Sequence, residues 1–177
     1  MEAERLFLSH VDGPVGKVAL LADPRGALVR IAFLHATSLD SFASACRGDG
    51  LRVVKDEHPT AEARRQLREY FERKREAFDL LLRPKGTPFQ IEVWKVLRRI
   101  PYGRTWSYGD VARTLGDPGA ARAVGRANNA NPLPIVVPCH RVIGADGSLV
   151  GFGGGLDAKR RLLELERGEH VEQGRLF

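Results

Sequence analysis

The sequence predicts an α+β protein built from two units, and three observations support this. Short apolar runs alternate with turn dipeptides in residues 1–83, which is typical of strands. Apolar residues recur with helical spacing through much of residues 84–177. A stretch containing proline and glycine, residues 83–88, separates the two textures. We therefore expect a small N-terminal α+β domain at 1–83, with an antiparallel sheet and a helix. A C-terminal domain at 84–177, rich in α-helix and similar to a winged helix-turn-helix, should follow.

The first unit opens as an antiparallel meander. Residues 5–10 and 15–21 are apolar runs separated by the turn Asp12-Gly13-Pro14. A second turn at 23–26 leads into a third run at 27–33. Three consecutive strands are therefore expected.

The rest of the first unit carries no catalytic pattern. Residues 61–75 predict a helix with one apolar face, whereas residues 36–50 fit either a helix or a loop. Cys46 lies among polar residues, which favours an inert or surface thiol over a metal ligand. With one cysteine and scattered histidines in this unit, we expect no metal and no cofactor.

The second unit begins with a helix at residues 89–100. Its apolar stripe consists of Ile91, Trp94, Val96, Leu97 and Ile100. Arg98 and Arg99 lie near its C-terminus, where cations complement the helix dipole, and Pro101 stops it.

The next segment predicts a helix-turn-helix. Ser107 and Asp110 have the spacing of a capping box, which starts one helix, and Gly116 ends it. Asp117 and Pro118 then supply an N-cap and a first-turn proline for a second helix. Two short helices joined by a tight turn are typical of a DNA-binding motif.

The charge pattern also favours DNA as a partner. The chain carries a net charge of +6, and residues 98–141 hold seven basic against two acidic side chains. Arg122 and Arg126 lie one turn apart on the second helix, among small residues that allow close approach to a groove. An ordinary αα-hairpin with a solvated basic face is the alternative.

A reactive segment follows this motif. Residues 134–138 predict a short buried strand or extended segment, and Cys139 and His140 come directly after it. An imidazole next to a thiol can take its proton and leave a thiolate. Because adjacent residues of an extended chain point to opposite sides, direct contact requires a local turn or a bridging water. A buried, unreactive cysteine is the alternative.

The last helix offers a carboxylate for this pair. Glu166 lies three and four residues after Leu163 and Leu162, and therefore on or beside the apolar face. A buried carboxylate needs a hydrogen-bonded partner, and His140 is available. Cys139, His140 and Glu166 would then be nucleophile, base and orienting group, unless Glu166 is an exposed acid at the helix end.

The combined motifs resemble the O6-alkylguanine-DNA alkyltransferase family, most closely over residues 86–167. The segments that carry the resemblance are Gly86-Thr87-Pro88-Phe89-Gln90, Ile100-Pro101-Tyr102-Gly103, Ser107-Tyr108, Arg122-Ala123-Val124-Gly125, Asn131-Pro132 and Ile135-Val136-Val137-Pro138-Cys139-His140-Arg141-Val142-Ile143. The resemblance implies single-turnover repair of duplex DNA, bound through the minor groove by the helix-turn-helix. The damaged guanine is flipped out, and its alkyl group passes irreversibly to a cysteine.

The resemblance also implies a role for each matching residue. Cys139 resembles the alkyl acceptor, His140 the base that acts through a water, and Glu166 the carboxylate that orients the imidazole. Asn131 resembles the residue that holds the turn beneath the site. Tyr108 resembles the hydroxyl donor to the leaving guanine.

Other positions match substrate and DNA contacts. Arg122 resembles the arginine that replaces the flipped base in the stack. The carbonyls of Cys139 and Val142 would accept from the guanine amino group, and the Gly153 N–H would face its oxygen. Phe152 stands where tyrosine is also found in the family, beside glycines at 153–155, which suggests a roomier pocket. Further DNA contacts are expected at Ala121, Gly125 and Arg126.

The sequence also bears on where the protein acts and on which other functions it could have. No apolar run approaches the ~20 residues of a membrane span, and the first residues lack a secretory pattern, so we expect a cytoplasmic protein without a membrane partner. We expect a monomer in solution, with cooperative binding along DNA left open. A non-catalytic DNA-damage sensor or regulator and a cysteine hydrolase are the rival functions.

Overall fold

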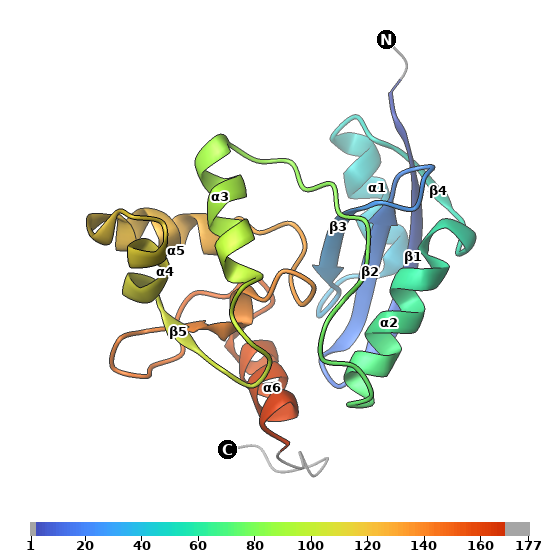
Figure 1. The fold of residues 1–177 in the computed structure, drawn as a ribbon. Helices are drawn as coiled ribbons and strands as arrows, with labels where there is room; N and C mark the ends of the chain where they lie inside the picture. Colours follow the sequence, from blue (N-terminus) through green and yellow to red (C-terminus); the bar gives the residue numbers. More distant parts are fainter. Residues whose placement is uncertain (1–2, 169–177) are drawn as a thin grey trace. The chain divides into compact units, whose positions relative to one another are not determined.

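The computed structural model describes residues 3–168, and the chain divides into two compact units between Lys85 and Gly86 (Figure 1). Each unit has its own buried core. The α+β fold class predicted from the sequence is confirmed.

The first unit contains one four-stranded sheet of order β3-β2-β1-β4. Its strands are β1 (Arg5–Gly13), β2 (Gly16–Ala22), β3 (Leu28–Phe33) and β4 (Arg52–Lys55). β1, β2 and β3 form the expected antiparallel meander, whereas β4 pairs with β1 in parallel. The sheet is therefore mixed: the expected antiparallel strands are present, and β4 adds a parallel strand that was not predicted. The ambiguous segment at 36–50 explains this, because it contains helix α1 (Leu39–Gly48), which returns the chain for a parallel strand.

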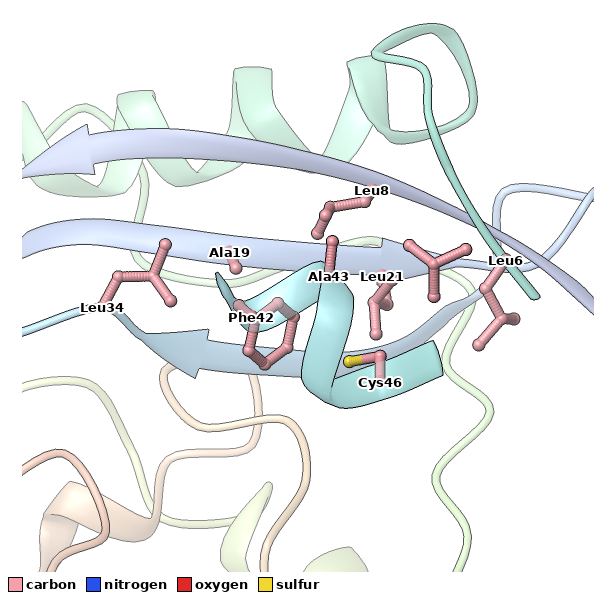
Figure 2. Packing of buried hydrophobic residues seen from close by; sticks show 9 residues of the cluster. Leu6, Leu8, Ala19, Leu21, Leu34, Phe42, Ala43 and Cys46 are labelled. Atoms are coloured by element: carbon pink, nitrogen blue, oxygen red, sulfur yellow. The ribbon is translucent and has the colours of Figure 1, made fainter. Parts of the chain in front are cut away.

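Helices cover both faces of this sheet. On one face, Phe42, Ala43 and Cys46 of α1 pack against β1 and β2 (Figure 2). Helix α2 (Ala61–Phe71) packs on the other face, where a side chain at Gly13 would collide with Phe71. A short 3₁₀ helix, His58–Thr60, precedes α2.

Two expectations for this unit need correction. Cys46 is not a surface residue but 1% exposed, because it follows Phe42 by one helical turn and shares its buried face. Burial raises the pKa of its thiol, which keeps it neutral. Helix α2 ends at Phe71 rather than Arg75, because Arg73 adopts φ 60° and donates its N–H to the Tyr70 carbonyl.

The second unit is mainly helical (Figure 1). Its elements are α3 (Pro88–Leu97), β5 (Trp106–Ser107), α4 (Tyr108–Thr114), the 3₁₀ helix η2 (Pro118–Ala120), α5 (Ala121–Asn129), the 3₁₀ helix η3 (Cys139–Arg141), β6 (Val142–Ile143) and α6 (Leu156–Arg167). Helices α3, α4 and α5 pack against one another, and the Trp94 indole N–H donates to the Ala127 carbonyl at 2.8 Å. The short strands β5 and β6 pair in parallel, which brings the start of α4 beside the reactive segment.

The helix starts were predicted with mixed success. The Ser107–Asp110 capping box is present in full, and α4 begins at Tyr108. Asp117, however, makes no side-chain capping bond, because η2 intervenes and α5 begins only at Ala121. Gly119 lies inside that turn and disfavours a regular α-helix. Over residues 3–168, no helix is both long and apolar enough to cross a membrane.

Candidate active site and nucleic-acid interface

The segment before the reactive cysteine is a buried turn and neither the strand nor the extended segment that was expected. Asn131 spans it: its Oδ1 accepts from the Leu133 N–H at 2.9 Å, and its Nδ2 donates to the Val137 carbonyl at 2.8 Å. The amide side chain thus takes the place of a partner strand. Ile135 in this turn has φ 74°, a conformation that is strained for a β-branched residue.

Cys139 opens the 3₁₀ helix η3, and this local turn removes the geometric objection to a Cys–His pair. Its N–H donates to the Val137 carbonyl at 2.8 Å, and its side chain is 4% exposed. Burial raises the pKa of the Cys139 thiol to about 11, against the opposing effects of the Asn131 amide and the Lys159 charge. The free protein therefore holds a neutral thiol, and ionisation requires a base.

His140 is placed to be that base. The ring is fully buried, and its Nε2 lies 2.7 Å from the Glu166 Oε1. Burial lowers the pKa of His140 despite the carboxylate, so the imidazole is neutral near pH 7. With the proton on Nε2, Nδ1 is an acceptor, and no group within residues 3–168 bonds to it.

Glu166 is 5% exposed, so the alternative of a solvent-exposed acid is wrong. Besides His140, it accepts from Arg141 Nε at 2.9 Å, from Arg141 Nη2 at 2.8 Å and from the Gly103 N–H at 3.2 Å. Burial disfavours its charged form, but the bonds and charges of His140 and Arg141 outweigh this and hold the pKa of Glu166 well below its usual value. The carboxylate is therefore ionised and fixed in direction.

Arg141 was not anticipated as part of this network. It is 6% exposed, and its Nη1 donates to the Ile100 carbonyl at 2.7 Å. Its guanidinium also lies over the Tyr102 ring, 5.7 Å from the centroid. In the sequence, Arg141 counted only as one of the basic residues that favour DNA binding. Nothing in the residue pattern indicated an ion pair between Arg141 and Glu166 of the last helix.

Lys159 of α6 was also missed. It is fully buried, and its Nζ donates to the Val142 carbonyl at 2.5 Å and to the Val150 carbonyl at 2.9 Å. Burial lowers the pKa of Lys159 to about 8. The signal was available, because Lys159 precedes Glu166 by two helical turns and so shares its face.

Tyr108 begins α4 close to the reactive segment. Its hydroxyl donates to the Val150 carbonyl at 3.0 Å, so that carbonyl accepts from both Tyr108 and Lys159. Burial and the nearby Cys139 raise the pKa of Tyr108, which keeps the phenol protonated. A Cβ added to Gly125 would lie 3.7 Å from the Tyr108 ring, so α5 approaches this ring closely.

The glycine-rich loop that precedes α6 packs against the end of α5. Gly151 has φ 55°, and a Cβ there would lie 3.0 Å from the Asn129 side chain. Phe152 is half-buried and Gly153 is exposed. Gly155 also has a positive φ, 88°, so two loop positions require glycine.

Helix α5 presents two different faces. Its buried residues are Val124, Ala127 and Asn128. Arg122 and Arg126 are exposed, Ala121 and Gly125 are half-buried, and helix α4 packs beside them. This arrangement is a helix-turn-helix with a basic outer surface, as predicted for a nucleic-acid interface. The predicted part of Arg122 in base flipping stays a prediction.

Metal ligands are not gathered in the part of the chain that the structure describes. Within residues 3–168, no three His, Cys, Asp or Glu side chains are placed to hold an ion.

Comparisons with known proteins show which family the chain resembles. Residues 88–168 match the family model described as 6-O-methylguanine DNA methyltransferase, DNA binding domain. A methylated-DNA–protein-cysteine methyltransferase of Methanosarcina acetivorans is 42% identical over 161 residues, which cover 91% of this chain and 98% of the relative. A protein of the same name from Mycolicibacterium paratuberculosis is 58% identical over 160 residues, with 89% and 90% covered.

Solved structures of similar proteins point to the same family. The OGT of Mycobacterium tuberculosis in complex with DNA is 43% identical, with a TM-score of 0.79 and 93% of each chain covered. The match to the Methanosarcina relative spans nearly its full length, both units included. The chain described here therefore belongs to the methylated-DNA–protein-cysteine methyltransferase family.

Proposed function

We propose that this protein repairs DNA directly, by moving an alkyl group from the O6 atom of guanine to the Sγ atom of its own Cys139. The observation that carries the assignment to Cys139 is the buried chain of contacts behind it. His140 follows Cys139 directly in η3, its Nε2 lies 2.7 Å from Glu166 Oε1, and Arg141 Nη2 donates to the same oxygen at 2.8 Å. These are the parts of an activated nucleophile.

The transfer is a single displacement. His140 Nδ1 takes the thiol proton through a bridging water, and Glu166 stabilises the resulting imidazolium. The thiolate attacks the alkyl carbon, a C–S bond forms, and the C–O bond breaks with its electron pair staying on guanine. The proton that left Cys139 ends on the guanine, so charge balances. The product thioether has no route back, and each protein molecule acts once.

Departure of guanine needs hydrogen-bond donors. Tyr108 supplies its hydroxyl and Gly153 its N–H, which stabilise the charge that develops on the base. In the structure the Tyr108 hydroxyl donates to the Val150 carbonyl, so it must exchange this acceptor for the base. Lys159 still donates to that carbonyl at 2.9 Å, and the exchange leaves no unpaired group.

Recognition uses the helix-turn-helix. We infer that α5 enters the minor groove with Ala121 and Gly125 at the closest approach, while Arg126 contacts phosphate and Arg122 fills the gap left by the flipped base. The Cys139 and Val142 carbonyls accept from the guanine amino group. By the same chemistry, O4-alkylthymine is a second substrate.

The test is the stoichiometry of the reaction. Wild-type protein incubated with a duplex that carries one O6-methylguanine should gain one methyl group per molecule, located by peptide mass spectrometry on the Cys139 peptide. Tight binding without a mass gain would support a damage sensor. Repeated turnover without an adduct would support a hydrolase. The expectations of a cytoplasmic monomer, and of cooperative binding along DNA, stay predictions.

Arg122→Ala should slow repair of duplex DNA at least tenfold and leave the reaction with free O6-benzylguanine within about twofold, because the free base needs no flipping. Single-turnover rates on the two substrates measure this difference. Arg68→Ala, at an exposed position of helix α2 in the first unit, is the control and should leave both rates unchanged. Equal losses on both substrates would contradict the role in the base stack.

The glycines that follow Phe152 should admit large alkyl groups. We expect free O6-benzylguanine and O6-methylguanine in DNA both to modify Cys139 completely. Mass spectrometry of the reacted protein checks this. A protein that reacts with the methyl group and never with the benzyl group would show that the loop restricts the pocket.

A further inference from the structure

Two backbone carbonyls around the reactive turn each accept a hydrogen bond from a buried side chain of a different helix. The Asn128 Nδ2 of α5 donates to the Cys139 carbonyl at 3.4 Å. The Lys159 Nζ of α6 donates to the Val142 carbonyl at 2.5 Å. The transfer mechanism gives neither contact a task.

Both side chains are unfavourable choices for a buried position. Asn128 is 2% exposed, and its Oδ1 has no hydrogen-bond partner within residues 3–168. Lys159 is fully buried, so its ammonium group has lost its hydrating water. It donates to two backbone carbonyls instead. Leucine or methionine would fill the same volumes without unpaired polar atoms or a buried charge. Their polar groups therefore call for a functional explanation.

The chemistry of the substrate suggests that explanation. Alkylation at O6 removes the hydrogen from N1, so the exocyclic amino group is the only N–H donor left on the damaged base of a nucleoside. A site that selects this base must therefore present acceptors. A carbonyl oxygen has two lone pairs. The Val142 carbonyl uses one for Lys159, and its second lone pair is available to the amino group. The Cys139 carbonyl accepts from the Val142 N–H and from Asn128, but the Asn128 bond is long, 3.4 Å, so the amino group can share that side of the oxygen.

We propose that Asn128 and Lys159 are positioning residues for base selectivity, which hold the Cys139 and Val142 carbonyls in the direction that accepts the guanine amino group. The inference rests on the alkyltransferase function proposed above. Because Asn128 belongs to α5, the helix that carries the basic surface is also the one that sets the first of these carbonyls.

The test compares two substrates that differ only in the amino group. O6-benzylguanine has it, and 6-benzyloxypurine lacks it. With the full chain and free bases, we expect wild-type protein to react roughly tenfold faster with O6-benzylguanine, as one or two hydrogen bonds allow. In Asn128→Leu and in Lys159→Met this preference should fall to about twofold or less. Arg160→Met, an exposed neighbour on α6, is the control and should keep the tenfold preference.

The ratio of the two reaction rates, with O6-benzylguanine and with 6-benzyloxypurine, separates a loss of carbonyl positioning from a general loss of reactivity or fold. A variant with a disturbed fold or a less reactive thiol loses rate on both substrates alike, and iodoacetamide labelling of Cys139 reports that loss separately. An unchanged tenfold ratio in both variants, or a wild-type ratio near one, overturns the inference. Absence of transfer to wild-type protein, both from these two substrates and from a duplex with O6-methylguanine, overturns the proposed function instead. If either variant fails to fold by circular dichroism, Asn128→Ser and Lys159→Gln replace it with the same expected ratios.

Discussion

Cys139→Ala should abolish alkyl transfer completely, because no other side chain of the site can act as the acceptor. The fold should survive, since removing one buried sulfur atom costs about 1 kcal/mol. The variant should still bind duplex DNA, because the basic surface of α5 is unchanged. Intact-protein mass spectrometry after incubation with alkylated duplex measures transfer, and a gel-shift titration measures binding.

The second cysteine of the chain provides the matched control. Cys46 is 1% exposed in the core of the first unit, where burial raises the pKa of its thiol. Cys46→Ala should therefore transfer one alkyl group per molecule like the wild type. An adduct on the Cys46 peptide, or residual transfer by Cys139→Ala, would refute the assignment of the acceptor.

Glu166→Ala should have the second largest effect, and on two properties at once. It leaves Arg141 as a buried charge without its partner, which typically lowers the free energy of unfolding by about 3–5 kcal/mol. It also removes the group that orients His140, so transfer should slow about a hundredfold or more. Urea unfolding and single-turnover kinetics on folded protein measure the two losses.

A double variant separates these effects. Arg141→Met in the Glu166→Ala background removes the orphaned charge and should restore part of the stability while transfer stays slow. Recovery of the rate together with stability would show that Glu166 acts only through the fold.

The same network predicts acid lability. The folded-state pKa values of Glu166 and His140 both lie below their ordinary values of 4.5 and 6.5. The unfolded chain therefore binds more protons in this range, and stability is lost as pH falls. Wild-type unfolding free energy should decline below about pH 6.5 through His140 and further below about pH 4.5 through Glu166. The decline below pH 4.5 should be shallower in Glu166→Ala.

Local signals predicted local structure well. The capping box at Ser107 and Asp110 requires only residues three apart, and it forms as predicted. The position of Glu166 followed from helical spacing alone, and the structure brings it to His140. In both cases the prediction required only the spacing of residues along one helix.

Features that depend on distant partners were not accessible. The apolar run at 134–138 has the composition of a strand, but the Asn131 side chain occupies its hydrogen-bonding groups and turns it. The parallel pairing of β4 with β1 depends on the path of α1, which the sequence left ambiguous. The spacing of Lys159 to Glu166 places it on the same helix face, but the two backbone carbonyls that accept from its Nζ could not be predicted, because backbone positions leave no trace in the residue pattern.

The position of Glu166 in the last turn of α6 also has a consequence for synthesis. A ribosome makes Cys139 first and adds Glu166 roughly a few seconds later at ordinary elongation rates. Until α6 docks, His140 lacks its anchor, and the thiol of a nascent chain has no oriented base. The nucleophile of a protein that reacts only once is therefore not activated until α6 has been made and has docked.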